Sequence, residues 1–267
     1  PSANDPRITD QQLPFVFRAT GRWDQEPPLL ADYLLKQTKQ VAMVADRSSY
    51  GQALAAGMRD ALGKAGVRPI IDESVDSGTR DFAPAITKLK AAVTASPTPS
   101  ASSTAAPSPS GQTGLAVFYG GYAPEAGALA KQLAGAGVKA QLAFGDAAED
   151  QALVSTASAE ADGALLAFPP DPKQVTSAAP FLAEFKRRYG TTASLYAVST
   201  YDATKLLADA ISRAGGTDGD AIRQALAATS QFNGAYWGKM TFDAKGDLQA
   251  KTYVLWTLRT GRFQQLP

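Results

Sequence analysis

GLAVFYGGYAPEAGALAKQLAGAGVKAQLAFGDA, residues 114–147, is the stretch that decides the fold of this chain. One apolar run ends at two glycines and Tyr122, and a second ends at a glycine and Asp146. Between the runs, residues 124–136 begin with proline, which fits the first turn of a helix. The stretch therefore predicts a strand, a helix and a second, parallel strand.

Tyr122 and Asp146 each follow the C-terminal end of a predicted strand. In an open parallel α/β sheet, ligands bind at that edge. An aromatic ring and a carboxylate there indicate a site for a small cationic or zwitterionic molecule. The pattern leaves two other interpretations open, because Asp146 also fits the N-cap of the next helix and Tyr122 fits an ordinary half-buried tyrosine.

Strands alternate with helices along most of the chain, which predicts an α/β fold with a parallel sheet. Residues 40–168 contain five predicted strands, enough for one doubly wound lobe, whereas the flanking stretches look like part of a second lobe whose main sheet is not in this chain. The predicted strands are 15–18, 40–45, 68–75, 115–119, 138–144, 163–168, 239–242, 251–258 and 262–265. The predicted helices begin at Pro27 and near Tyr50 and cover 82–91, 124–136, 147–157, 181–190, 196–214 and 220–228.

Residues 94–110 contain only Ala, Ser, Thr and Pro. Such a stretch buries too little apolar surface to offset chain entropy. Since the strand and helix pattern resumes directly after it, we predict a flexible surface insertion over 94–113. Its composition also resembles that of O-glycosylated stalks.

The composition of the chain excludes several classes of function. The 267 residues carry a net charge of +1 without a basic stripe, so we expect no nucleic-acid partner. The chain has no cysteine and no histidine, which removes thiolate and imidazole chemistry. No apolar run has the length of a membrane span. We predict no catalytic residue, no metal and no cofactor; Gly120 and Gly121 lack the further glycine of a phosphate loop.

Four segments carry a resemblance to a known family: 42–54, 117–127, Gly145 with Asp146, and 232–247 with its FDAKGD turn. They resemble the periplasmic leucine/isoleucine/valine-binding proteins, which are the substrate-binding proteins of branched-chain amino acid ABC transporters. The resemblance covers essentially the whole chain outside residues 94–110. It implies the type I periplasmic binding fold, in which two doubly wound lobes close over the ligand.

The resemblance also implies a domain organisation. The family's chains begin with several strand–helix units of the first lobe that are absent here, so we expect an N-terminally truncated chain with an incomplete first lobe. The implied lobes are residues 1–20 with 169–240, and residues 21–168 with 249–267. The three implied crossing strands are 18–21, 168–172 and 240–248. The chain starts at Pro1, so we expect any signal peptide to lie outside it.

In the second lobe, the resemblance implies three ligand contacts. Tyr50 matches a tyrosine that closes over the ligand, and Tyr122 matches an aromatic wall of the site. Asp146 matches the acidic residue that pairs with the ligand's α-ammonium group, a position where the amino-acid binders usually have Glu. The residue pattern alone also allows Tyr50 to be an ordinary half-buried tyrosine.

In the first lobe, the resemblance implies four further contacts. Ser2, Ala3 and Asn4 match a loop whose carbonyl and side-chain groups reach the ligand. Tyr196 matches an aromatic residue that lines the side-chain pocket, although an aromatic residue at the start of a helix also suits a core position.

The resemblance implies a non-enzymatic, extracytoplasmic solute-binding protein. We expect it to capture an aliphatic, branched-chain amino acid between two lobes and to deliver it to an ABC transporter permease. We expect a monomer in the periplasm or outside the cell, without membrane insertion of this chain; anchoring through a leader outside the chain stays open. The alternative is a ligand-sensing domain of a receptor or regulator that binds an amide or a related small molecule.

Overall fold

The structure is a computed structural model that describes residues 3–95 and 114–267. The chain forms two compact units: unit 1 is Pro1–Trp23 with Pro169–Val254, and unit 2 is Asp24–Phe168 with Leu255–Pro267. The predicted insertion lies mostly outside the described residues. Its first two positions, Thr94 and Ala95, end a helix instead, because alanine-rich sequence favours continuation of a helix.

The chain passes from one unit to the other three times, at 23–24, 168–169 and 254–255. The last passage differs from the predicted crossing at 240–248. That segment belongs to unit 1, where Met240, Phe242 and Leu248 are part of the hydrophobic core.

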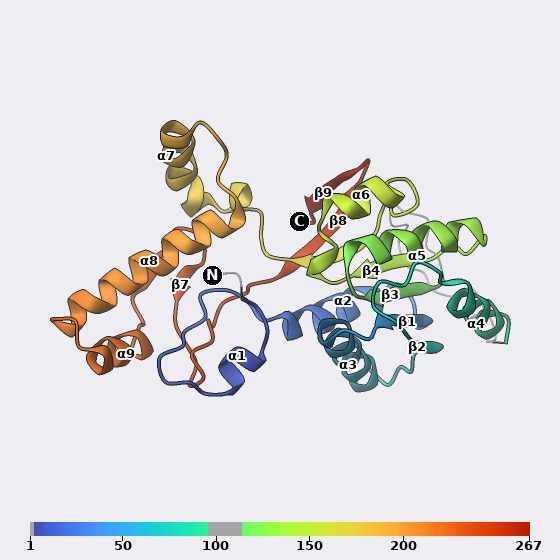
Figure 1. Ribbon diagram of the computed structural model, residues 1–267, viewed down its shortest axis with the longest axis horizontal. Helices are drawn as coiled ribbons and strands as arrows, with labels where there is room; N and C mark the ends of the chain where they lie inside the picture. Colours follow the sequence, from blue (N-terminus) through green and yellow to red (C-terminus); the bar gives the residue numbers. More distant parts are fainter. Residues whose placement is uncertain (1–2, 96–113) are drawn as a thin grey trace. The chain divides into compact units, whose positions relative to one another are not determined.

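Unit 2 contains a seven-stranded sheet in the order β2-β1-β3-β4-β5-β8-β9 (Figure 1). The predicted α/β class is confirmed, because the strands β1 to β5 pair in parallel. The remaining strands, β8 and β9, form an antiparallel hairpin at one edge of the sheet. The strands are β1 (Val41–Asp46), β2 (Ile71–Val75), β3 (Ala116–Gly120), β4 (Gln141–Phe144), β5 (Leu165–Phe168), β8 (Val254–Arg259) and β9 (Arg262–Gln265).

Helices cover both faces of this sheet, as predicted for a doubly wound lobe (Figure 1). One face is covered by α2 (Glu26–Leu34) and α3 (Ser49–Lys64), and the other by α5 (Ala123–Gly135) and α6 (Gln151–Ala157). The helix α4 (Ala83–Ala95) packs against β2 and α5, and the short turns η1 (Trp23–Gln25) and η2 (Asp146–Ala148) precede α2 and follow β4. Strands β1 and β3 are buried along their whole length because helices lie on both sides of them.

The apolar face of α3 is buried. Leu54, Met58 and Leu62 are each 0% exposed, and they follow one another at the i, i+4 spacing that the sequence shows. Ser48 starts the helix, since its side chain accepts a hydrogen bond from the backbone N–H of Gly51 at 2.9 Å.

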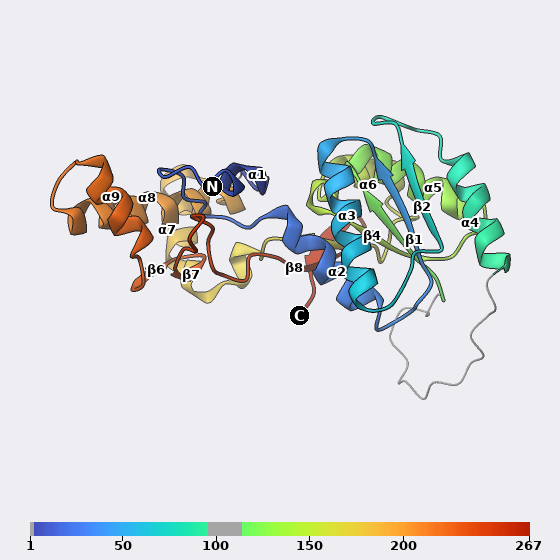
Figure 2. The same ribbon diagram turned by 90° about the horizontal axis from the view of Figure 1, so that it is seen from below.

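Unit 1 is mostly helical (Figure 2). Its helices are α1 (Arg7–Asp10), η3 (Pro172–Gln174), η4 (Thr176–Ala178), α7 (Ala179–Tyr189), α8 (Leu195–Ala214) and α9 (Gly219–Ala227). Within the described residues, its one sheet is the antiparallel pair of β6 (Phe232–Gly234) and β7 (Gly238–Met240). The turn between β6 and β7 is anchored by Asp202, whose buried carboxylate accepts hydrogen bonds from three backbone N–H groups, those of Ala235, Tyr236 and Trp237.

Asp202 is buried within α8 at 1% exposure. Its carboxylate binds a segment far along the chain, since Ala235 lies 33 residues away. A separate groove of about 630 Å³ lies between α7 and α8. Two aromatic residues that line it, Tyr201 and Tyr189, are 41% and 66% exposed.

The predicted strand over 15–18 is wrong. Phe15 is 62% exposed, and Arg18 makes a single isolated bridge to Asp247 in place of a strand ladder. Pro14 contributes, because proline lacks the N–H that a ladder needs. The Arg18 side chain is buried, which an alternating strand pattern does not anticipate.

Candidate functional site

The order of the strands in unit 2 contains a switch in direction between β1 and β3. From β1 the chain continues to β2 on one side of β1, and then returns to form β3 on the other side. At such a switch in direction, the loops after the two central strands diverge and leave room for a ligand at their carboxyl ends. The loops that lead from β1 into α3 and from β3 into α5 flank this point.

The structure brings together the three predicted site residues of unit 2 at this edge. Tyr50 lies in the first turn of α3, Tyr122 is the N-cap residue of α5, and Asp146 begins η2 directly after β4. The Tyr50 hydroxyl donates a hydrogen bond of 2.7 Å to Asp146 Oδ1. The rings of Tyr50 and Tyr122 lie 5.5 Å apart between centroids.

The three side chains differ in how much of them reaches solvent. Tyr50 is only 4% exposed, whereas Tyr122 is 45% exposed and Asp146 is half-buried. The solvent-exposed part of this group of side chains therefore comes mainly from Tyr122 and Asp146. Tyr50 lies beneath them, and its hydroxyl is already engaged with Asp146 and with the backbone N–H of Ala147, which it accepts at 3.2 Å.

Glu26 is a fourth member of this site that the sequence interpretation missed. It is 0% exposed in the first turn of α2, and its Oε2 accepts a hydrogen bond of 2.8 Å from the backbone N–H of Asp146. A signal was available, since Glu26 stands at the i, i+4, i+8 spacing with Leu30 and Leu34, which are also 0% exposed. A glutamate at the head of a helix is ordinarily a solvated charge near the helix dipole, so its burial is not evident from local sequence.

Gly145 allows Tyr50 and Glu26 to approach the Asp146 turn this closely. A Cβ at position 145 would lie 2.4 Å from the Tyr50 hydroxyl and 3.0 Å from Glu26 Oε2. Any other residue would therefore push these groups away from the peptide that carries Asp146.

The site is electronegative. Burial, followed by the nearby charges of Glu26 and Asp146, raises the pKa of Tyr50 well above its ordinary value. The phenol therefore stays protonated at neutral pH and keeps donating to Asp146. A half-exposed carboxylate with a second carboxylate close behind it suits a cationic group such as an ammonium.

A local contact decides against the alternative that Asp146 caps the next helix. The helix α6 is capped by Asp150, whose side chain accepts from the N–H of Ala152 at 2.7 Å. The loop residues Arg47 and Ser48 have structural contacts, because Arg47 pairs with Asp76 and Ser48 caps α3.

The predicted site residues of the first lobe all belong to unit 1 or lie outside the described residues. Ser2 lies outside them. The carbonyl of Ala3 accepts a hydrogen bond from Arg18 Nη1 at 2.7 Å, and the carbonyl of Asn4 accepts one from the N–H of Trp23 at 3.1 Å. Tyr196 is 51% exposed in the first turn of α8, so it is not a core residue.

The described residues contain no cluster of three or more acidic side chains placed to hold a metal ion. Among the same residues, no helix combines the length and the apolar character that crossing a membrane requires.

Known proteins resemble this chain over nearly its whole length. Residues 1–260 match the family described as periplasmic binding protein. A Leu/Ile/Val-binding protein homolog 1 from Brucella melitensis is 31% identical over 264 residues; the match covers 98% of this chain and 65% of that relative, so the chain spans less than two thirds of its length.

Solved structures show the same fold. A leucine binding protein, LivK, from Thermotoga maritima superposes with a TM-score of 0.77 at 23% identity, covering 99% of this chain and 70% of that one. The branched-chain amino acid transporter substrate binding protein LivJ from Streptococcus pneumoniae, solved in complex with isoleucine, gives a TM-score of 0.72 at 23% identity over 98% of this chain and 70% of its own. The expected type I periplasmic binding fold is thereby confirmed.

Proposed function

Because the chain belongs to the periplasmic binding protein family, we propose that it binds an aliphatic, branched-chain amino acid outside the cytoplasm and delivers it to the permease of an ABC transporter. The observation that carries the proposal is that the half-buried Asp146 carboxylate and the exposed Tyr122 ring both lie next to Tyr50, at the switch point of the unit 2 sheet. The names of the Brucella relative and of the LivK and LivJ structures support the class of ligand.

Each group of the site has a role in this proposal. Asp146 pairs with the α-ammonium of the amino acid through a charge-assisted hydrogen bond. The ring of Tyr122 covers the bound amino acid and excludes water from that contact. Tyr50 and Glu26 hold the Asp146 turn in place from below, through the hydrogen bonds to Oδ1 and to the backbone N–H. Binding requires no chemical step, so the function is transport and not catalysis.

The test compares L-leucine with 4-methylpentanoate, which lacks the ammonium group, by calorimetry on the full natural protein. We expect Asp146→Asn to weaken leucine binding by about tenfold to a hundredfold, because a hydrogen bond to a charged group contributes roughly 1.5–3 kcal/mol. The variant should leave the affinity for 4-methylpentanoate unchanged or raise it.

The matched control is Asp150→Asn, which alters a nearby exposed carboxylate that caps α6. We expect leucine affinity to change by less than about twofold in this variant. The proposal for Asp146 fails if Asp146→Asn binds leucine as tightly as the natural protein does.

A further inference from the structure

Asp46 ends β1, next to the switch point of the unit 2 sheet, and is only 1% exposed. Its Oδ1 accepts two hydrogen bonds from Ser48, one from the backbone N–H at 2.9 Å and one from the hydroxyl. Its Oδ2 is buried and has no hydrogen-bond partner among the residues that the structure describes. Leaving a buried acceptor unpaired costs free energy, so this oxygen needs a donor that is not one of these residues.

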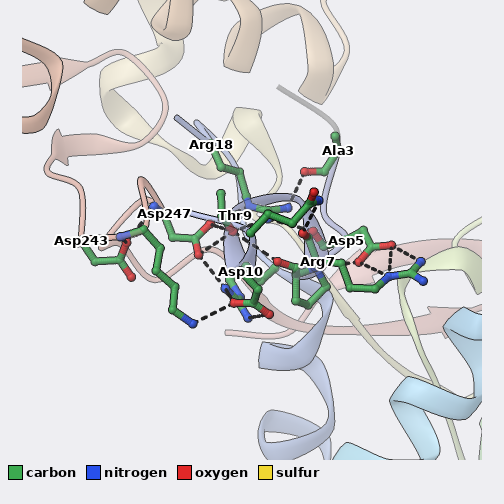
Figure 3. Close-up of polar contacts among 12 residues, drawn as sticks. Ala3, Asp5, Arg7, Thr9, Asp10, Arg18, Asp243 and Asp247 are labelled. Carbon is green, nitrogen blue, oxygen red and sulfur yellow. Dashed lines mark hydrogen bonds and ion pairs between the residues drawn. The ribbon is translucent and has the colours of Figure 1, made fainter. Parts of the chain in front are cut away.

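The two other buried aspartates that the structure describes have partners on both oxygens. In unit 1, Arg18 Nε donates to Asp247 Oδ1 at 2.7 Å, and Arg22 Nη1 donates to Asp247 Oδ2 at 2.6 Å (Figure 3). Asp202 accepts hydrogen bonds from backbone N–H groups on both Oδ1 and Oδ2. The unpaired oxygen of Asp46 is therefore an exception within this fold.

A second unpaired group lies on the neighbouring strand. Tyr119 in β3 is 0% exposed, and its hydroxyl has no hydrogen-bond partner in the described part of the chain. Tyr119 pairs with Val44, two residues before Asp46 in β1, so the side chains of Tyr119 and Asp46 project from the same face of the sheet. The hydroxyl lies beside Gly121, just past the end of β3, since a Cβ there would be only 2.5 Å from it. The phenol therefore leans toward the strand end at which Asp46 lies.

The phenol of Tyr119 responds to the charge of Asp46. Burial, followed by the charges of Asp46 and Glu125, raises the pKa of Tyr119 above its ordinary value, and Arg80 opposes this only in part. The hydroxyl therefore keeps its proton at neutral pH and is a hydrogen-bond donor. A donor and an acceptor thus lie near each other without a direct hydrogen bond between them.

We propose that Asp46 and Tyr119 bind one internal water molecule between the carboxyl ends of β1 and β3. The water accepts a hydrogen bond from the phenol O–H and donates one to Asp46 Oδ2, so that both buried groups are paired at once. A monovalent cation fits this pair less well, because it would bind the carboxyl oxygen but give the phenol O–H no acceptor.

This water joins the two strands that lead to the ligand edge of unit 2. Strand β1 continues through Ser48 into the first turn of α3, which carries Tyr50, and β3 continues through Gly121 to Tyr122. The bridge stabilises the spacing between the two strand ends, whatever the ligand is. Water binding at Asp46 is thus independent of the proposed function.

The direct test is a high-resolution crystal structure of the full natural protein without ligand. We expect one water oxygen within about 3.2 Å of both Asp46 Oδ2 and the Tyr119 hydroxyl oxygen. In crystals of Tyr119→Phe, which keeps the ring and its edge contact with Phe82, this water should be lost or should contact Asp46 alone. A direct hydrogen bond between the two side chains, a metal ion, or no density between them overturns the proposal.

Hydrogen exchange gives a second test in solution. We expect the opening equilibrium constants of the β1 and β3 amides to rise about fivefold in Tyr119→Phe, since a bridged hydrogen bond is lost. If the hydroxyl were unpaired in the folded protein, phenylalanine would instead remove a buried polar group without a partner and slow the exchange. The matched control is Tyr33→Phe in α2 of the same unit, whose partly exposed side chain should give a change of less than about twofold. Unchanged or slower exchange in Tyr119→Phe overturns the proposal.

Discussion

Asp146 in unit 2 and Asp247 in unit 1 are two carboxylates in opposite surroundings. Asp247 is 6% exposed and lies against two arginines, so its charge is balanced inside the protein. Asp146 is half-buried, accepts a hydrogen bond from the neutral phenol of Tyr50, and has the carboxylate of Glu26 behind its backbone. The difference separates a carboxylate that maintains structure, Asp247, from one that in the proposed function pairs with the ligand, Asp146.

The pKa directions of the neighbouring groups agree with this contrast. Around Asp247, the hydrogen bonds from Arg22, Arg18 and Thr9 overcome the effect of burial and lower its pKa. Beside Asp146, burial and the charges of Glu26 and Asp146 raise the pKa of Tyr50. Positive charge stabilises the first carboxylate from within the fold, whereas two carboxylates lie close to the phenol of Tyr50 in the second region.

The largest expected effect is on stability and comes from Asp247→Ala. Removing this carboxylate leaves Arg18 buried without its ionic partner, which costs about 3–5 kcal/mol of unfolding free energy. Urea unfolding of the natural protein and the variant measures the loss. Asp146→Ala should lose only about 1 kcal/mol in the same experiment, because it breaks one hydrogen bond at a half-exposed position. Equal losses in the two variants would contradict the contrast between the two acids.

The pH dependence of Asp247 gives a second measure of the same contrast. Its pKa is lower in the folded protein than the ordinary value of about 3.9, so the folded state binds this proton more weakly than the unfolded chain does. Its stabilising contribution is therefore complete above that ordinary value and is lost as the pH falls through the lowered folded value. Asp247→Asn should show a smaller loss of stability than the natural protein when the pH is lowered below 4.

Local sequence could predict the ligand edge of unit 2 but not the partner of each charge. Tyr122 and Asp146 could be predicted to share one edge because the strand ends of a parallel sheet lie along the same edge. In the structure, the Tyr50 hydroxyl lies 2.7 Å from Asp146 Oδ1 at this edge. Glu26 could not be assigned to the site from local sequence, because its hydrogen bond is with the backbone N–H of Asp146, 120 positions along the chain. No periodic pattern encodes a contact over that distance.

Arg18 shows the same limit in unit 1. A strand was predicted over residues 15–18, but Arg18 is buried there in an ion pair with the carboxylate of Asp247, 229 positions away. The order of the strands was also beyond local reasoning, since alternating strands and helices fit several sheet orders. The switch point between β1 and β3, which explains why a site lies there, became visible only in the folded chain.

Tyr50→Phe has an intermediate expected effect and tests whether Tyr50 acts through Asp146. Phenylalanine keeps the ring next to Tyr122 but removes the hydroxyl that serves Asp146 and Ala147. We expect about 1 kcal/mol lower unfolding free energy in urea and a several-fold weaker leucine affinity, smaller than the loss in Asp146→Asn. An affinity loss as large as that of Asp146→Asn would show instead that the Tyr50 hydroxyl contacts the ligand itself.

Glu149 is a third carboxylate, and the smallest expected effect concerns it. Its backbone N–H donates to the carbonyl of Asp146 at 2.9 Å, and burial, with a smaller contribution from the charge of Asp150, raises its pKa to about 7. The folded protein holds this proton more tightly than the unfolded chain, so stability falls as the pH rises from the ordinary value of 4.5 through 7.

Glu149→Gln should remove that fall. We expect the variant to match the natural protein in urea at pH 4 and to exceed it by about 1 kcal/mol or less at pH 8, since the side chain is partly exposed and keeps some hydration. Parallel stability profiles from pH 4 to 8 would mean that Glu149 ionises as in water. Glu149 would then be fully ionised at pH 7 and would add its negative charge to the loop that follows Asp146.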